Sequence, residues 1–381
     1  MKIISSERLP IKSWADDLEE ETLRQAKDLA NHPFAFKWVC LMPDAHPGFG
    51  MPIGGVVATQ KVIIPNAVGV DIGCGMIAVK TSLANLKRET ITKIMGVIRK
   101  NIPVGFRHQK ETKEWSGFSQ APEIEIVQKE LSSARKQIGT LGSGNHFIEI
   151  LKEEGGNVWL MLHSGSRNFG YKTAEHFFKK AVNFSERSLQ KPPSRDLSFL
   201  PLDSQDGQDY FSAMNFCLAF AQANRRFMME QVKEAYQNLT RCSFSPEIDV
   251  HHNYAAQETH FGERVFVHRK GAILAAKGQK GIIPGSMGTP SFIVEGLGNP
   301  ESFMSCSHGA GRVMGRKKAI ASLDLQKEQE KMKDIIGAPR SRDELQEAPS
   351  AYKDINKVID QQKDLVKVLI KLNPIAVITG N

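Results

Sequence analysis

The spacing of hydrophobic residues along the chain predicts several amphipathic helices. Apolar side chains recur every three or four residues, the spacing of one helical face, over residues 16–29, 83–101, 124–137, 210–239, 323–332 and 352–370. In the longest of these segments, Phe216, Phe220, Ala223 and Phe227 mark the apolar face. The first segment also begins with acidic residues, which favour a helix N-terminus.

Short runs of β-favouring residues lie between these helices, at 56–58, 158–162, 264–267 and 291–294. Strands and helices alternate irregularly, which favours an α+β fold with central β-sheets surrounded by helices over a doubly wound fold. Residues 42–55 are rich in glycine and proline and are predicted to form a shaped loop that leads into a strand. Residues 183–209, which include Lys191-Pro192-Pro193-Ser194, are predicted to form an exposed loop or lid. We expect residues 1–381 to form a single domain.

Composition narrows the class of protein. With 41% hydrophobic and 24% charged residues, the chain resembles an ordinary soluble protein with a large core. It has no apolar run long enough for a membrane span, and its first residues lack the pattern of a signal peptide, so we expect a cytoplasmic protein. The five cysteines are scattered without CxxC spacing, which argues against a disulfide framework and a zinc ribbon. A net charge of +8 gives mild support to a polyanionic partner.

The segment Val70-Asp71-Ile72-Gly73-Cys74-Gly75-Met76 contains the first candidate metal ligands. Its glycines allow a close approach to the backbone. A carboxylate and a thiol together suit a transition metal of borderline softness, such as zinc or manganese. Asp71 and Cys74 would fit equally well as a turn residue and a core residue, so the interpretation depends on further ligands.

Histidines in glycine-rich or strand-end settings supply those further ligands. They are His146, three residues before Glu149; His163, at the end of an apolar run; the pair His251 and His252; and His308. His146 and Glu149 would share one face only in a helix. One metal needs three or four ligands, so the surplus indicates two metals or one histidine with another task.

His308 is the candidate for that other task, because a neutral imidazole is a competent nucleophile toward phosphorus. Arg312 and Arg316 follow at intervals of four residues, which on a helix would place both guanidinium groups on one face toward a phosphate. The alternative is that His308 caps this helix. Asp44 and His46 are similarly open between a catalytic or supporting role and simple loop capping.

Other polar residues suggest an anionic ligand. The loop Pro284-Gly285-Ser286-Met287-Gly288-Thr289 offers backbone donors and hydroxyls that suit a phosphate or a nucleotide. Basic side chains near the candidate ligands would form a groove for a polyanion: Arg167, Arg269, Lys270, Arg312 and Arg316.

Taken together, these motifs resemble the RtcB family of RNA-splicing ligases, over nearly the whole chain. The matching segments occur in the same order as in the family, at residues 42–55, 70–76, 142–149, 163–167, 249–253, 268–272, 284–289, 308–312 and 347–355. The resemblance implies a family-specific α+β fold with a cleft for two metals. It also implies a GTP- and Mn²⁺-dependent ligase that joins an RNA 2′,3′-cyclic phosphate or 3′-phosphate end to a 5′-hydroxyl end, in tRNA splicing or RNA repair.

The resemblance also implies roles for individual residues. Cys74 would bridge two Mn²⁺ ions, with Asp71 and His146 completing one site and His163 and His252 the other. His308 would take GMP as a phosphoramidate, and the RNA would then pass through an RNA-3′-pp-5′-G intermediate. Nucleotide contacts would come from Asn145, Glu149, His252, Asn253, Pro284, Gly285, Ser286, Met287, His308, Gly309, Ala310, Gly311 and Tyr352. RNA phosphates would be bound by Arg167, Lys270, Arg312 and Arg316.

The chain departs from the family pattern in several respects. Family members commonly end in Lys-Gly, whereas this sequence reads Val377-Ile378-Thr379-Gly380-Asn381, so Thr379 cannot supply the charge of that lysine. Gly315 replaces a residue that is usually serine, and 381 residues is short for the family, which suggests a divergent paralogue. An activating protein or an RNA-repair or release-factor partner also fits this resemblance. The alternatives are a dimetal RNA phosphodiesterase or cyclic-phosphate hydrolase, and a metal-stabilised RNA-binding protein without catalysis.

Overall fold

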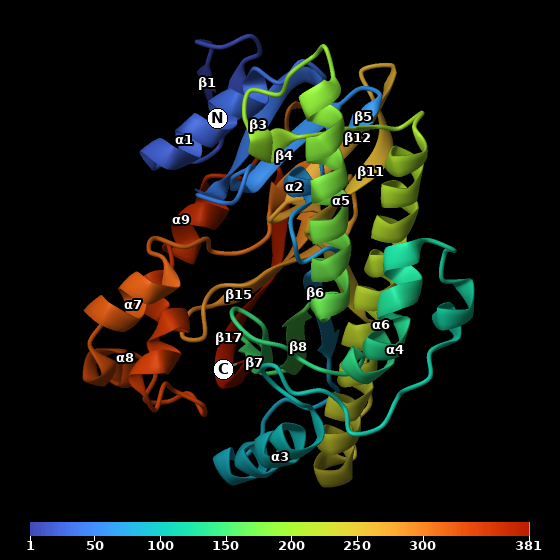
Figure 1. Ribbon diagram of the computed structural model, residues 1–381. Helices are drawn as coiled ribbons and strands as arrows, with labels where there is room; N and C mark the ends of the chain where they lie inside the picture. Colours follow the sequence, from blue (N-terminus) through green and yellow to red (C-terminus); the bar gives the residue numbers. More distant parts are fainter. Residues whose placement is uncertain (381) are drawn as a thin grey trace.

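The computed structural model describes residues 1–380, so Asn381 lies outside the described residues, and two large β-sheets form its centre (Figure 1). The six-stranded sheet has the order β1 (Lys2–Ile4), β2 (Ile11–Ser13), β3 (Ala35–His46), β4 (Ile53–Thr59), β12 (Glu263–Lys270) and β11 (Asn253–His260). The seven-stranded sheet has the order β10 (Ile248–His251), β6 (Gly75–Lys80), β8 (Val158–Ser164), β7 (Phe147–Glu153), β17 (Val366–Thr379), β15 (Ser291–Gly296) and β14 (Lys280–Ile283). Two small sheets pair β13 (Ala272–Leu274) with β16 (Ser305–Ser307) and β5 (Val62–Ile63) with β9 (Leu200–Pro201).

The two large sheets pack face to face because their strands are apolar on both faces. In β6, Met76 and Ala78 join the core between the sheets, whereas Ile77 and Val79 point to the opposite face. This is the two-residue period of a strand. When both faces of a sheet are buried, the sequence of each strand is a nearly continuous run of apolar residues. The strands thus form the two inner layers of the molecule.

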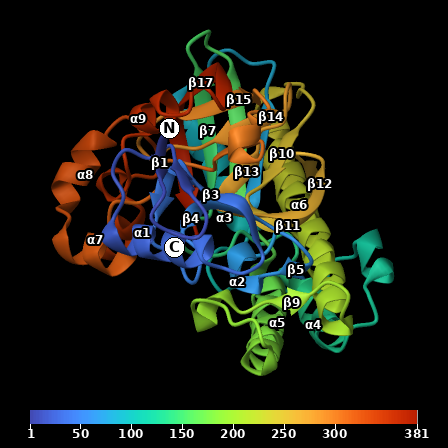
Figure 2. The same cartoon turned by 90° about the horizontal axis from the view of Figure 1, so that it is seen from above.

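Helices cover the outer faces of both sheets. Helices α3 (Arg88–Asn101) and α6 (Gln205–Thr240) pack on the seven-stranded sheet, and α1 (Glu20–Ala30) packs on the six-stranded sheet. Helices α2 (Pro65–Val68), α4 (Glu125–Gln137) and α5 (Arg167–Arg187) share a further core with α6. Helices α7 (Arg316–Ser322), α8 (Leu325–Lys331) and α9 (Ile355–Asp360) lie on the opposite side of the molecule from α4, α5 and α6 (Figure 2). The predicted α+β class is confirmed.

Short 3-10 helices connect several of these elements: η1 (Ser116–Gln120), η2 (Arg195–Leu197), η3 (Pro300–Ser302), η4 (Arg342–Glu347) and η5 (Pro349–Ala351). Within residues 1–380, none of the helices is both long enough and apolar enough to cross a membrane.

Several predicted elements are confirmed. The helix predicted at 124–137 is α4, and the one predicted at 210–239 is α6, which begins earlier at Gln205 because the Ser204 side chain caps it by accepting from the Gly207 N–H. All four predicted strand segments lie within β4, β8, β12 and β15. Helix α3 begins at Arg88, five residues after the predicted start, and α8 is shorter than predicted.

Other predictions were wrong. The helix predicted at 352–370 is only the six-residue α9, and the strand β17 follows from Val366. Pairing with β7 on one side and β15 on the other overrides the helical spacing of this segment. Residues 42–46 belong to strand β3 instead of a loop, and α5 was not predicted at all.

The exposed loop or lid predicted at 183–209 is largely absent. Its first five residues belong to α5 and its last five to α6. Between them, Leu197, Phe199 and Leu200 are fully buried, and β9 pairs with β5. These apolar side chains anchor residues 197–200 against the core, whereas most of residues 186–195 are exposed or half-buried at the surface.

Candidate active site

Four candidate metal ligands lie at neighbouring strand ends of the seven-stranded sheet. His252 directly follows β10, Cys74 directly precedes β6, His163 lies near the end of β8, and His146 directly precedes β7. These strands are adjacent in the order β10-β6-β8-β7. Because neighbouring strands are antiparallel, the end of one meets the start of the next, and the four side chains meet at one edge. Asp71 reaches the same place from the turn before β6, where its Oδ1 accepts from the Ser166 N–H at 3.2 Å.

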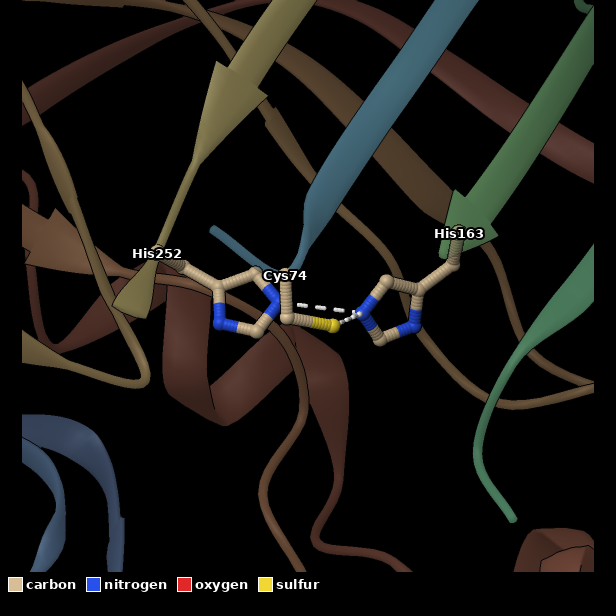
Figure 3. A group of neighbouring side chains, drawn as sticks. All are labelled: Cys74, His163 and His252. Atoms are coloured by element: carbon tan, nitrogen blue, oxygen red, sulfur yellow. Dashed lines mark hydrogen bonds between the residues drawn. The ribbon is translucent and has the colours of Figure 1, made fainter. Parts of the chain in front are cut away.

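The donor atoms form two groups that share Cys74. In one group, the Cys74 Sγ lies 3.2 Å from the His163 Nε2, which lies 2.9 Å from the His252 Nε2. Figure 3 shows these three side chains pointing toward one another. In the other group, the His146 Nε2 lies 3.3 Å from the Cys74 Sγ and 3.1 Å from Asp71 Oδ2. The ligand atoms of each group lie within 4.8 Å of one another.

Backbone and side-chain oxygens fix the orientation of the three imidazole rings. The Nδ1 of His146 lies 2.9 Å from the Leu141 carbonyl oxygen, and that of His163 lies 3.0 Å from the Asn145 carbonyl oxygen. The His252 Nδ1 lies 3.3 Å from Asn253 Oδ1. An oxygen acceptor at Nδ1 requires the proton on that nitrogen, which leaves the Nε2 lone pair free. All three lone pairs therefore face the centre.

This arrangement fits bound cations. Two Nε2 lone pairs that face each other at 2.9 Å repel unless a cation lies between or beside them. Burial holds the pKa of His163 and of His252 well below the usual value, so both rings stay neutral and able to bind metal. Burial and the neighbouring Asp71 raise the pKa of the Cys74 thiol, and a metal would be needed to hold it as thiolate. The mixture of imidazole, thiolate and carboxylate suits a borderline transition metal.

His308 stands beside this ligand set. It directly follows β16, and its ring centroid lies 4.7 Å from that of His252. Its Nδ1 lies 2.7 Å from Oδ2 of Asp44, a fully buried residue of β3. The same carboxylate oxygen accepts from the backbone N–H of His308 at 3.1 Å. Burial alone would raise the pKa of Asp44, but its electrostatic interaction and hydrogen bond with the His308 ring lower this pKa, which keeps Asp44 ionised. The hydrogen bond to Asp44 places the ring proton of His308 on Nδ1, so the lone pair of Nε2 is free.

Glycine allows this loop to approach β3 so closely. A Cβ at Gly311 would lie 2.3 Å from the Asp44 carbonyl oxygen, and Gly311 has a φ of +74°. A side chain at this position would separate the 308–311 loop from β3.

One cavity of about 500 Å³ contains the ligand groups and His308. Its wall includes every residue to which the family resemblance assigns a role except Arg167: Asp71, Cys74, Asn145, His146, Glu149, His163, His252, Asn253, Lys270, Pro284, Gly285, Ser286, Met287, His308, Gly309, Ala310, Gly311, Arg312, Arg316 and Tyr352. The cavity also borders Glu19, Phe147, Glu347 and Thr379, so residues from both ends of the chain meet around it.

Comparison with known proteins agrees with this geometry. The family model described as "tRNA-splicing ligase RtcB" matches residues 25–380. The chain belongs to the RtcB family. It is 39% identical over 409 aligned residues to the RNA-splicing ligase RtcB of Escherichia coli K12, covering 100% of this chain and 99% of that protein. It is 31% identical to the tRNA-splicing ligase RtcB of Pyrobaculum aerophilum, covering 98% of this chain and 95% of that protein.

Arg167 is the one residue with a role implied by the family resemblance that lies outside the cavity wall of this RtcB-family chain. Its Nη1 lies 3.4 Å from the His146 Nδ1, and its Nε donates to Thr140 Oγ1 at 3.3 Å. A Cβ at Gly142 would collide with its guanidinium group. Arg167 therefore lies behind the ligands, where its charge faces Asp71 and Cys74.

Two further expectations about basic residues were wrong. Arg269 is fully buried and pairs with Glu258, so it does not contribute to a groove. No helix follows His308 directly, since α7 begins only at Arg316. Arg312 and Arg316 converge instead through Glu347, whose two carboxylate oxygens accept at 3.2 Å and 3.1 Å. The sequence places Glu347 at the start of the family-like segment 347–355 but does not reveal this role, because Glu347 lies more than thirty positions from the arginines that it joins.

His146 and Glu149 reach the cavity without sharing a helix. Glu149 lies in β7, and His146 lies just outside that strand, so the alternation of the strand does not separate them. Glu149 is 2% exposed, and burial raises its pKa to about 8. A carboxyl group of this kind is protonated at neutral pH and can donate a hydrogen bond.

Lys270 of this RtcB-family chain is also unusual. Its Nζ donates to the carbonyl oxygens of Phe49 at 2.5 Å and Asn66 at 3.1 Å, so the amine holds two segments of the cavity wall together. Burial lowers the pKa of Lys270 to about 7. Its amine therefore loses its proton at a much lower pH in the folded chain than in the unfolded one, where a lysine has a pKa of about 10.4.

Lys270 should make stability rise with pH above neutrality. Between about pH 7 and pH 10, the unfolded chain holds a proton on this amine that the folded chain lacks, so raising the pH favours folding by up to about 1.4 kcal/mol per pH unit. Urea unfolding of metal-free protein at pH 7, 8 and 9 should show the wild type gaining this much relative to Lys270→Met. The matched substitution of the exposed Lys129 on α4 should show no such trend. Parallel pH profiles for wild type and Lys270→Met would contradict the assignment.

Proposed function

We propose that this RtcB-family protein is a GTP- and Mn²⁺-dependent RNA ligase. It joins an RNA end with a 3′-phosphate or 2′,3′-cyclic phosphate to an end with a 5′-hydroxyl, in tRNA splicing or RNA repair. The observation that carries the proposal is the position of His308, which Asp44 orients beside two metal-ligand groups within one cavity. Neither a simple hydrolase nor an RNA-binding protein needs a buried carboxylate that orients an extra histidine. The names of the relatives support the same activity.

Two Mn²⁺ ions fit the two ligand groups. Asp71, Cys74 and His146 would hold one ion, and Cys74, His163 and His252 the other. When bound, the ions supply Lewis-acid stabilisation of the negative charge that gathers on the transferring phosphoryl groups. Oriented Nδ1 partners keep the three rings in the ligating tautomer.

His308 carries the covalent step. Its Nε2 attacks the α-phosphorus of GTP, a P–N bond forms, the bond to the β-phosphate oxygen breaks, and pyrophosphate leaves with the electron pair. The Asp44 carboxylate accepts the Nδ1 proton as a hydrogen bond and stabilises the positive charge that develops on the ring.

The RNA then replaces His308 on the GMP. A 3′-phosphate oxygen attacks the GMP phosphorus, the P–N bond breaks, and RNA-3′-pp-5′-G forms. The 5′-hydroxyl oxygen of the second RNA attacks the 3′-phosphate phosphorus, loses its proton, and displaces GMP. A 2′,3′-cyclic phosphate must first add one water to open to a 3′-phosphate.

Other cavity residues suit the nucleotide and the RNA. The 284–287 loop, held by a 2.7 Å hydrogen bond from the Ser286 N–H to Thr289 Oγ1, would accommodate GMP together with Asn145, Glu149, Asn253 and Tyr352. The Nε of Arg316 donates to Glu347, and the guanidinium group is half-exposed. Its two Nη groups could therefore bind an RNA phosphate. Arg312 would assist it, whereas Arg167 and Lys270 would act mainly by supporting the wall. Thr379 in place of the usual lysine should weaken selection of guanine.

We also propose that residues 1–381 act as one catalytic domain, because the cavity joins residues from β3 to β17. The five cysteines are all free and buried, which fits a reducing compartment such as the cytoplasm.

Ligation of two short RNAs tests the proposed function. One RNA carries a 3′-phosphate and the other a 5′-hydroxyl, and the protein is supplied with Mn²⁺ and GTP. A joined product that requires both GTP and Mn²⁺ is the expected result. Opening of a 2′,3′-cyclic phosphate without any joining would instead identify a hydrolase, and binding of the RNA without turnover would identify an RNA-binding protein.

A further inference from the structure

Helix α6 carries two adjacent polar residues, Asn224 and Arg225, in the middle of its buried side. Both are fully buried. Burying a guanidinium group is costly unless hydrogen bonds and a counter-charge offset the lost hydration. The surrounding positions of α6 are mostly apolar and pack on the sheet, so packing alone does not call for an arginine here.

Arg225 uses its guanidinium group to hold three separate segments. Its Nη1 donates to the carbonyl oxygens of Gly73 at 2.9 Å and Ser164 at 3.1 Å. Its Nε and Nη2 donate to Asp249 Oδ1 at 2.9 Å and 2.6 Å, and Nη2 lies 3.1 Å from the His251 Nδ1. Asp249 thus supplies the counter-charge, and the other partners are groups next to metal ligands.

Each of these partners adjoins one ligand of the same metal group. Gly73 precedes Cys74, Ser164 follows His163, and His251 precedes His252. The ladder of β10, β6 and β8 brings these segments side by side and ends at the ligands, where the His252 N–H donates to the Cys74 carbonyl oxygen at 2.9 Å. At this end of the ladder, Arg225 adds one side-chain contact next to each ligand. We infer that Arg225 is the positioning residue that sets the distances within the Cys74, His163 and His252 group. This inference rests on the proposed metal binding.

Asn224 extends the same arrangement to the loop before His146. Its Oδ1 accepts from the Gly139 N–H at 2.7 Å, and its Nδ2 donates to the Thr140 carbonyl oxygen at 3.2 Å. It also donates to the Gly165 carbonyl oxygen at 3.1 Å. The middle of α6 therefore fixes backbone groups on both sides of the ligand set.

Lysine cannot replace arginine at this position. A lysine is a point charge on a flexible stem, whereas the planar guanidinium group directs several N–H donors in fixed directions. A single ammonium nitrogen has three N–H donors, so Arg225→Lys cannot keep all five contacts that the guanidinium group makes with Gly73, Ser164, Asp249 and His251. The ligand segments would then be free to shift, and supporting partners of this kind typically change metal affinity by roughly 10- to 100-fold.

Cobalt binding tests this inference without reference to catalysis. Metal-free protein is titrated with Co²⁺, and the thiolate-to-cobalt absorption that Cys74 would produce reports occupancy. Arg225→Lys should bind Co²⁺ roughly 10- to 100-fold more weakly than the wild type. The matched control is Arg226→Lys, because Arg226 is the next residue of α6 and is exposed. This control should bind Co²⁺ as the wild type does.

The outcomes separate this inference from the proposed function. No thiolate-to-cobalt absorption in the wild type would overturn the proposed metal site. Wild-type affinity in a folded Arg225→Lys, even with a lower melting temperature, would show a merely structural arginine and overturn the inference. If Arg225→Lys does not fold, the Asp249→Asn variant tests the inference instead. It keeps an oxygen acceptor for Arg225 but removes the counter-charge. It should weaken Co²⁺ binding, and wild-type affinity would overturn the inference.

Discussion

Cys74→Ala should abolish binding of the two proposed Mn²⁺ ions and lower RNA ligation by roughly 10³-fold or more, since metal stabilisation of a phosphoryl transition state is worth several kcal/mol. Cys74 is the only residue that belongs to both ligand groups, so its loss leaves each group with two ligands. The substitution removes a single sulfur atom from a strand start, and the fold should remain intact. Metal content after dialysis against Mn²⁺ and the ligation rate measure the effect.

Cys242→Ala provides the control for this prediction. Cys242 is also buried, but it lies just after α6 in the core on the outer face of the seven-stranded sheet. This variant should keep two ions and nearly full activity. Two ions bound with wild-type affinity to Cys74→Ala would show that the thiol is not shared between the metals.

His308→Ala should abolish the covalent GMP adduct while leaving metal binding unchanged. His308 belongs to neither ligand group, so its loss removes the nucleophile and not the ions. Incubation with Mn²⁺ and GTP labelled at the α-phosphate should give an alkali-stable, acid-labile adduct in the wild type and none in the variant. Ligation should fall by at least roughly 10⁴-fold, as expected when a covalent nucleophile is removed.

Two variants sharpen this prediction. His176→Ala removes a histidine of α5 outside the cavity and should leave the adduct unaffected. Asp44→Asn keeps the shape of the residue that orients His308 but changes the tautomer it favours, so the adduct should still form at a rate reduced by roughly 10²- to 10⁴-fold. An adduct that survives His308→Ala would place the covalent step on another residue.

The structure brings the predicted candidate donors together, but their arrangement could not be worked out from residue types alone. Asp71, Cys74 and the histidines stand out because of their residue types and glycine-rich settings. Their division into two groups followed from the family resemblance, because strand order decides which ligands meet. The Asp44 and His308 pair joins residues 264 positions apart, so no local pattern could link them.

The errors also have physical causes. Strand β17 has a helical spacing of apolar residues, but its pairing with β7 and β15 determines its conformation. Nothing in the sequence singles out Arg225, because two of its partners are main-chain carbonyls and the others, Asp249 and His251, meet it only through the fold. In the sequence, Arg225 differs from its neighbours only as one of two polar residues, Asn224 and Arg225, on the apolar side of a long helix. The role of such residues becomes clear only when their packing partners are known.

The central position of β17 has a consequence for biosynthesis. The strand lies between β7 and β15, yet it is the last of the described elements to be translated. Until it emerges from the ribosome, the inner edges of those two strands remain unpaired and prone to aggregation. The sheet can be completed only after β17 has followed all the other described elements out of the ribosome, so the catalytic cavity should fold late and should benefit from chaperones that protect exposed strand edges.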